Sequence, residues 1–149
     1  MAVPRALLVP AIAALLLGCE MTPPSGPCAA PEVAAEAGLI PADVAPVASI
    51  GRRGVRLLDG LGGRVAVLDV QAGRRPDGLA HVGVRLANCT GRDFAFEAAT
   101  QFYDVAAVAA QPPTLRRRVF LPAGTTRDYT EVSRNPAAAS FFVEVGAAR

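Results

Sequence analysis

The side chains best suited to chemistry in this sequence are three cysteines and one histidine. Cys19, Cys28 and Cys89 carry thiols, and His81 is the one histidine among 149 residues. A four-ligand zinc site would need Cys28, Cys89 and a carboxylate to converge near the histidine. No serine stands in a Gly-x-Ser-x-Gly context, which is typical of one large class of hydrolases. The sequence therefore predicts no catalytic residues, no metal site and no cofactor.

Cys19 closes the stretch Leu16-Leu17-Gly18-Cys19, which follows an apolar run. The run Ala6–Leu17 is about twelve residues long, within the range of secretory signals and too short for a permanent membrane helix. The stretch resembles the lipobox of bacterial lipoproteins, in which the cysteine thiol receives a diacylglyceryl group and the new amine is acylated after cleavage. We expect a signal peptide over residues 1–18 and lipidation of Cys19.

A lipidated Cys19 would place the mature chain in the periplasm, with the membrane as its first partner. Each buried CH₂ contributes about 0.8 kcal/mol, so several acyl chains form a lasting anchor. Residue 20 is Glu rather than the Asp that resembles an inner-membrane retention signal, which favours the outer membrane over the inner membrane. The alternative is an ordinary secretory signal followed by a coincidental cysteine.

Cys28 and Cys89 remain as a pair in a compartment that permits disulfides. A bridge between them would close a loop of about sixty residues and contribute about 4 kcal/mol in the chain-entropy model. It would also attach the N-terminal tail to the domain. Two free thiols are the alternative, because the sequence does not show whether the two residues approach each other.

Composition divides the mature chain into a linker and one domain. Residues 19–46 are rich in Pro and Ala, a composition that stays extended and builds no core. Residues 47–149 carry short segments of period two, punctuated by Gly, Pro, Asn and Asp. All 15 basic residues are Arg and they face 13 acidic residues, which is too even a balance for a nucleic-acid-binding surface.

Seven segments of the domain have the alternating pattern of apolar and polar residues that predicts half-buried strands. In 79–88, for example, Val82, Val84 and Leu86 share one face while His81 and Arg85 share the other. The seven segments are Val55–Leu58, Arg64–Val70, Leu79–Asn88, Asp93–Asp104, Leu115–Leu121, Thr125–Ser133 and Ser140–Val145. Two packed sheets bury so many strands most simply, so we expect an all-β, immunoglobulin-like antiparallel β-sandwich.

The order of turns and aromatic residues forms a further pattern. The strand at 82–88 ends in an Asn turn, and the aromatic strand after it ends in Phe102-Tyr103-Asp104. A Leu-Pro-Ala-Gly turn follows at 121–124, and Arg134-Asn135-Pro136 precedes the last strand. This pattern resembles the YcfL-like family of small periplasmic lipoproteins from Gram-negative bacteria, over about Val65–Val145. The resemblance implies an immunoglobulin-like domain with a role in the cell envelope. It implies no catalytic residue.

Arg116, Arg117 and Arg118 form the most polar local feature. Arg116 and Arg118 share one strand face and are candidates for contact with a partner or with an anionic ligand such as a lipid head group. The alternative is a solvated edge strand whose charges prevent edge-to-edge pairing. Arg52, Arg53 and Arg56 form a second basic run.

Three functional hypotheses remain after these observations. The first is a non-catalytic adaptor that binds another cell-envelope protein, for instance at a sheet edge. The alternative is a binder of an anionic ligand or of peptidoglycan through the Arg-rich surface. The third, an enzyme with an unrecognised site, ranks below both and would require a deep pocket lined by convergent polar groups.

Overall fold

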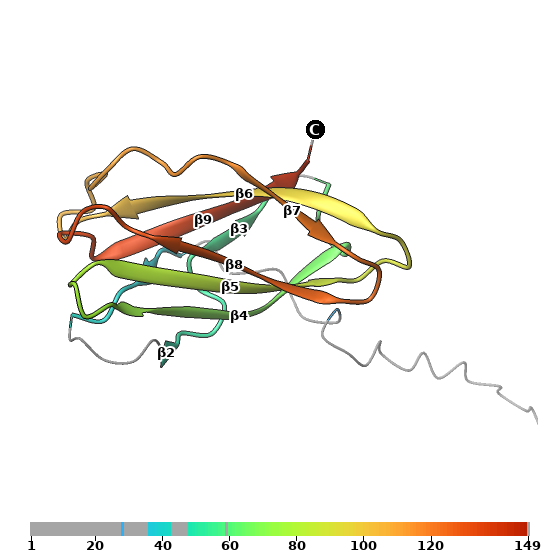
Figure 1. Ribbon diagram of the computed structural model, residues 1–149, viewed down its shortest axis with the longest axis horizontal. Coiled ribbons are helices and arrows are strands. Elements are labelled where there is room, and N and C mark those ends of the chain that lie inside the picture. The colour runs from blue at the N-terminus through green and yellow to red at the C-terminus, as the bar shows by residue number, and fades with distance from the viewer. Residues whose placement is uncertain (1–27, 29–35, 43–47, 59, 149) are drawn as a thin grey trace, which may run out of the picture.

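The computed structural model describes Cys28 and residues 36–42, 48–58 and 60–148. These residues form nine strands and no α-helix (Figure 1). The strands are β1 (Gly38–Leu39), β2 (Ala48–Ser49), β3 (Val55–Leu57), β4 (Val65–Arg74), β5 (Ala80–Asn88), β6 (Phe94–Tyr103), β7 (Arg117–Leu121), β8 (Thr126–Val132) and β9 (Ser140–Ala147). In this part of the chain, no helix has the length and apolar character needed to cross a bilayer.

Two sheets pack against each other (Figure 1). One sheet has the order β1-β9-β6-β7, with β3 also paired to β9, and the other has the order β2-β4-β5-β8. All pairings are antiparallel except that of β3 with β9, which is parallel. The expected all-β sandwich is confirmed, and each of the seven expected strands is present. The short strands β1 and β2 are additional.

The core lies between the sheets and follows the period-two pattern of the sequence. In β5, the side chains of Val82, Val84 and Leu86 are at most 1% exposed, whereas Arg85 is exposed. From the other sheet, the rings of Phe96, Phe102 and Phe141 enter the same core at 0% exposure. Alternate side chains of a strand point to opposite faces, so one apolar face per strand is enough to build this core.

β1 lies within residues 19–46, which the sequence analysis assigned to the linker, but it belongs to the domain. Gly38 pairs with Phe141 at the start of β9, and the neighbouring Ile40 is 6% exposed in the core. A Cβ atom at residue 38 would collide with the Phe141 ring, so the close approach of β1 requires glycine. The contact depends on two residues, too few to alter the composition of a Pro- and Ala-rich tract.

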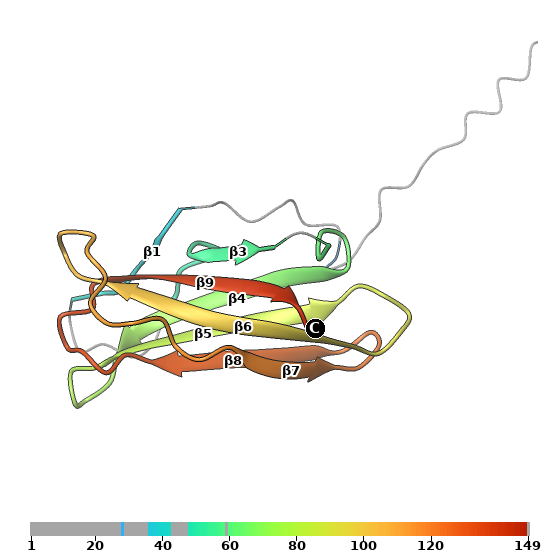
Figure 2. The same cartoon turned by 90° about the horizontal axis from the view of Figure 1, so that it is seen from above.

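One edge of the first sheet is covered and the other is open. β1 and β3 pair with successive parts of β9, at Phe141 and at Val143–Val145. At the opposite edge, β7 ends the first sheet and β8 ends the second, and the two edge strands lie side by side (Figure 2). The alternative interpretation of the strand at 115–121, an edge strand, therefore agrees with the position of β7.

β7 starts two residues later than expected. The expected strand includes Leu115, but this residue precedes β7 and its side chain is 84% exposed. Thr114 makes the ladder contact instead: its backbone N–H donates to the Thr100 carbonyl at 2.9 Å, and its hydroxyl accepts the Thr100 N–H at 2.8 Å. These bonds satisfy β6 where β7 is missing, and Leu115 is left free of the core.

Candidate functional site

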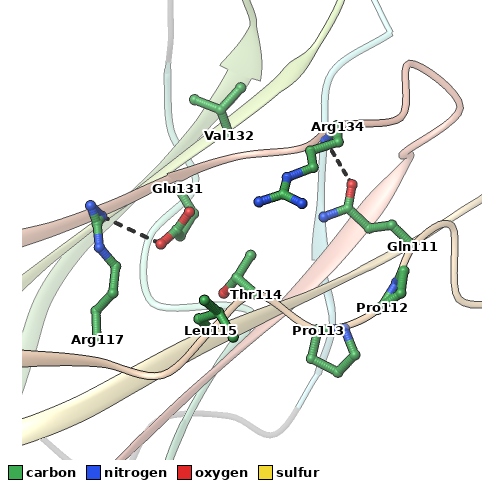
Figure 3. Close-up of a pocket in the computed structure, with 9 residues that line it drawn as sticks. All are labelled: Gln111, Pro112, Pro113, Thr114, Leu115, Arg117, Glu131, Val132 and Arg134. Atoms are coloured by element: carbon green, nitrogen blue, oxygen red, sulfur yellow. Dashed lines mark hydrogen bonds and ion pairs between the residues drawn. The ribbon is translucent and has the colours of Figure 1, made fainter.

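A groove of about 520 Å³ opens between the β6–β7 connection and the end of β8 (Figure 3). Its walls combine an apolar part from Pro112, Pro113, Leu115 and Val132 with a polar part from Gln111, Thr114, Arg117, Glu131 and Arg134. We call it the β7–β8 groove. Its volume lies within the range of about 300–1,000 Å³ that is typical of ligand sites.

Gln111 and Arg134 are held together at one end of the groove. The Arg134 backbone N–H donates to Gln111 Oε1 at 2.6 Å, and Gln101 Nε2 donates to the Gln111 carbonyl at 2.7 Å. In Figure 3 the Arg134 guanidinium extends over the space between Val132 and Gln111. Among the described residues, this guanidinium has neither an ion-pair partner nor a hydrogen-bond acceptor, so it is available to a ligand.

Arg117 bridges the two edge strands at the other end of the groove. Its Nη1 lies 3.4 Å from Glu131 Oε1 and donates to the Thr130 carbonyl at 3.2 Å. The Glu131 side chain is only 16% exposed, whereas that of Arg117 is 57% exposed. Arg117 therefore closes this end with a paired charge, whereas Arg134 has no ion-pair partner among the described residues.

A buried polar cluster lies under the groove. The Tyr129 hydroxyl lies 3.1 Å from Thr100 Oγ1, and Thr114 lines the groove while bonding the Thr100 N–H. Burial raises the pKa of Tyr129, an effect that the hydrogen bond with Thr100 opposes in part. The phenol therefore stays neutral, and Thr114 is the member of this cluster that lines the groove.

The free edge of β8 supplies backbone groups beside the groove. The Ser133 N–H donates to the Ala80 carbonyl, and the Asn88 N–H donates to the Thr125 carbonyl. These two bonds flank the β5–β8 register at its two ends, so every second residue of β8 from Thr125 to Ser133 directs its backbone groups toward β5. Backbone direction alternates along an antiparallel strand, so Thr130 and Val132 face away from β5. Of these groups, the Thr130 carbonyl accepts from Arg117. The others are placed to pair with an added strand.

The two predicted contact residues, Arg116 and Arg118, lie outside this groove. Arg116 Nη2 lies 3.3 Å from Glu144 Oε2, and Arg56 Nη1 lies 3.7 Å from Glu144 Oε1. Arg118 stands opposite Glu97 in the β6–β7 register. One arginine of each basic run, Arg56 and Arg116, thus meets the same carboxylate on the outer face of the first sheet.

This outer face also has a depression of about 670 Å³, lined in part by Arg56, Arg116, Glu97 and Gly146. The Arg56 guanidinium lies 4.8 Å from the centre of the Phe142 ring, which orients it beside the depression. The depression is broad, and it combines charges of both signs with an apolar part from Leu57 and Leu58.

The three cysteines have different positions. Cys19, the candidate lipidation site, lies outside the described residues. Cys28 and Cys89 form a disulfide, with their Cα atoms 5.5 Å apart. Cys89 follows β5, and its N–H donates to the Arg64 carbonyl at 2.8 Å. Within the described part of the chain, no three His, Cys, Asp or Glu side chains gather as metal ligands would.

His81 lies on the outer face of the second sheet, beside a pit of about 80 Å³. Burial lowers the pKa of His81, and the nearby Arg75 lowers it further. Arg85 and Asp128 at the same pit bond each other, with Nε 2.8 Å from Oδ1. The volume is small compared with typical ligand sites, so this pit is a weaker candidate than the groove.

Three residues of the groove, Gln111, Glu131 and Arg134, were not among the residues predicted to bind a partner. Residues 105–113 lie between two of the expected strands, and Arg134 belongs to the segment that precedes the last strand. The available signal was Pro112-Pro113 directly before an edge strand, because proline donates no ladder hydrogen bond and marks a break in pairing.

Comparison with known proteins relates the chain to others through structure alone. No protein-family model and no curated protein matches the sequence. The crystal structure of Campylobacter jejuni cj0090 is similar over 64% of this chain and 98% of that chain, with a TM-score of 0.56 and 16% identity. A DUF1425 family member from Shewanella sp. pv-4 aligns over 54% of this chain and 80% of its own, with a TM-score of 0.47 and 15% identity. At these identities, the likeness to cj0090 shows a shared fold.

Proposed function

We propose that this chain is a membrane-anchored periplasmic lipoprotein of the YcfL-like type, and that its anchor lies in the outer membrane rather than in the inner membrane. Its sandwich acts as a non-catalytic adaptor that binds another cell-envelope protein in the β7–β8 groove. The Leu16–Cys19 stretch supports the anchor, and the pattern over Val65–Val145 supports the family.

The observation that carries the adaptor role is the position of the groove beside a free strand edge. An extended segment of a partner can pair with the outward backbone groups of Val132 while its apolar side chains contact Pro112 and Leu115. The guanidinium of Arg134 can bind a carboxylate of the same segment. The groove therefore fits an extended, acidic stretch of polypeptide.

Site-directed photocrosslinking of the full chain in intact cells tests this role. A photoreactive residue at Leu115, which is 84% exposed, reports on the groove, and one at Val105, which is 92% exposed, is the matched control outside it. We expect a crosslinked envelope protein from position 115 and none from position 105. A peptide from the captured protein should then bind the purified chain and compete with the crosslink. Equal capture at both positions, or failure of the peptide to compete, would reject the proposal.

The variant Arg134→Ala tests the charge in the groove, with Arg92→Ala as a control that removes the same charge elsewhere. Loss of one charge-assisted bond should weaken the peptide about tenfold, or about 1.4 kcal/mol. The control should leave the affinity unchanged. Equal affinities for both variants would exclude Arg134 from recognition.

A second candidate function is the binding of an anionic ligand or of peptidoglycan at Arg56 and Arg116. The convergence of both guanidinium groups on Glu144 beside a depression favours it. Purified peptidoglycan should then be retained by the wild-type chain and released by the variant Arg56→Ala/Arg116→Ala. Retention of the polymer by this variant would reject the second candidate.

A further inference from the structure

Two segments near the N-terminus attach to opposite ends of the sandwich. Cys28 is bonded to Cys89, which follows β5, whereas Gly38 pairs with Phe141 at the start of β9. We call the end formed by residues 60–64, 89–93 and 122–127 the Cys89 end. The opposite end, formed by residues 75–79, 104–111 and 133–139, is the Ser140 end.

The two ends are about 34 Å apart, because β6 runs from one to the other over its 10 residues at about 3.4 Å each. In Figure 1, β6 starts at the right near the Cys89 end and its arrowhead lies at the left, beside the start of β9. The choice of attachment point therefore decides which end of the domain is nearer to an anchor.

The chain length to each attachment point differs about twofold. Cys28 is nine positions after Cys19, a segment that can span at most about 30 Å, whereas Gly38 is nineteen positions after Cys19, a segment that can span about 65 Å. Without the disulfide, a lipid on Cys19 would hold the domain by the longer segment and by its Ser140 end. With the disulfide, the shorter segment holds the Cys89 end.

We propose that the Cys28–Cys89 disulfide turns the Cys89 end of the sandwich toward the membrane and holds it within about 30 Å of the anchored Cys19. This inference rests on the proposed lipid anchor. The disulfide thus sets the orientation of the domain in addition to any effect on its stability.

The charges of the Cys89 end fit a surface of anionic head groups. Arg64, Arg92 and Arg127 are exposed there, and Asp93 is the one acidic residue that the structure describes in the three segments. Asp93 is partly engaged, since its Oδ1 accepts the Ala123 N–H at 2.9 Å. Each basic residue close to an anionic bilayer contributes about 1 kcal/mol of attraction.

The orientation has a consequence for the β7–β8 groove. Gln111 and Arg134 belong to the Ser140 end, so the open part of the groove faces away from the bilayer. A partner in the aqueous compartment can then reach it without displacing the domain from the membrane.

Two matched insertions test the proposal in the full, lipidated chain. The same twenty-residue Gly/Ser segment is inserted either between Ser25 and Gly26 or between Val33 and Ala34. A flexible segment of this length has a mean end-to-end distance of about 25 Å by itself. The first insertion lengthens the path from Cys19 to Cys28, and the second lengthens only the path from Cys28 to Gly38. Both retain the two cysteines.

Energy transfer to a head-group dye reports the distance, in vesicles of phosphatidylethanolamine and phosphatidylglycerol. The donor is placed by a non-natural residue at Gly91, where a side chain meets open space, or at Val105 at the Ser140 end. We expect higher transfer from residue 91 than from residue 105 in the wild-type chain. The insertion before Cys28 should reduce the transfer from residue 91 by at least half, and the insertion after Cys28 should leave it unchanged.

A third variant, Cys28→Ser/Cys89→Ser, removes the bridge itself. Transfer from residue 91 should fall and transfer from residue 105 should rise. If both insertions lower the transfer equally, or neither lowers it, in a chain that carries lipid on Cys19, the orientation is overturned while the anchor stands. Absence of lipid from Cys19, measured by mass spectrometry of the mature chain, would instead overturn the anchor and this inference with it.

Discussion

The side-chain oxygens of Thr100 and Tyr129 lie 3.1 Å apart in the core and join β6 of one sheet to β8 of the other. Thr100 is 0% exposed and Tyr129 is 2% exposed, so water cannot replace either partner. A buried polar group without a partner is costly, which makes this contact a determinant of how the sheets are aligned.

The variant Tyr129→Phe should lower the free energy of unfolding by about 1–3 kcal/mol, because it keeps the ring but leaves the Thr100 hydroxyl without its partner. Urea denaturation measures the change. Tyr103→Phe is the control, because the Tyr103 hydroxyl makes no hydrogen bond with any described residue. Equal losses for the two variants would show that the contact between the sheets contributes nothing specific.

Stability should fall as the pH rises above 10. Burial raises the pKa of Tyr129 above its ordinary value of 10.0, so the native state retains this proton where the unfolded chain releases it. The unfolded state then binds fewer protons, and the free energy of unfolding decreases with pH in that window. Denaturation at pH 8 and pH 11 should show a smaller decrease for Tyr129→Phe than for the wild-type chain. An identical decrease in both would assign the effect to other groups.

His81 should titrate below 6.5, because burial and then the charge of Arg75 lower its pKa. It is the one histidine of the chain, so its imidazole signals in an NMR titration need no further assignment. The contribution of His81 to the free energy of unfolding should be fully present above pH 6.5. It should be lost as the pH drops through the lowered pKa, because the unfolded chain then binds more protons than the native state. Arg75→Ala should move the midpoint upward in part. A midpoint above 6.5 would contradict this account of the site.

Asn88→Asp should lower the free energy of unfolding by about 2–4 kcal/mol. Asn88 Nδ2 donates to the carbonyls of Arg92, Leu121 and Pro122, at 2.8, 3.0 and 3.1 Å, and a carboxylate would place negative charge against all three. Asp has the same shape, so the change removes donors without opening a cavity. The loss should be smaller at pH 3 than at pH 7, because a protonated Asp regains one donor. A loss independent of pH would point to packing instead.

The strands could be predicted because a half-buried strand alternates apolar residues, which face the core, with polar residues, which face solvent. Val82, Val84 and Leu86 alternate with exposed neighbours, and the structure places them in the core as expected. The start of β7 could not be predicted in this way, because the hydrogen bonds of Thr114 take over the pairing and the Leu115 side chain is exposed to solvent. Local alternation says nothing about where a ladder begins.

The candidate site could not be predicted in the same way because its parts come from different sheets. Gln111 precedes β7 and Arg134 follows β8, and neither carries a pattern that links it to the other. Their proximity depends on β7 and β8 being the two edges at one side of the sandwich. Similarly, the attachment of β1 depends on one glycine beside the Phe141 ring, which a linker composition conceals.

The short strands β1 and β3, which pair along β9, also limit how copies of this domain can associate. A sheet grows into a filament only when both of its flanks accept a new strand, and here the β9 flank is already occupied at Phe141 and Val143–Val145. The strands on that side of the two sheets, β1, β2 and β3, have only two or three residues each, so they offer an added strand much shorter ladders than β7 and β8 do. The architecture therefore favours addition of a partner strand beside β7 and β8 over growth from the opposite side.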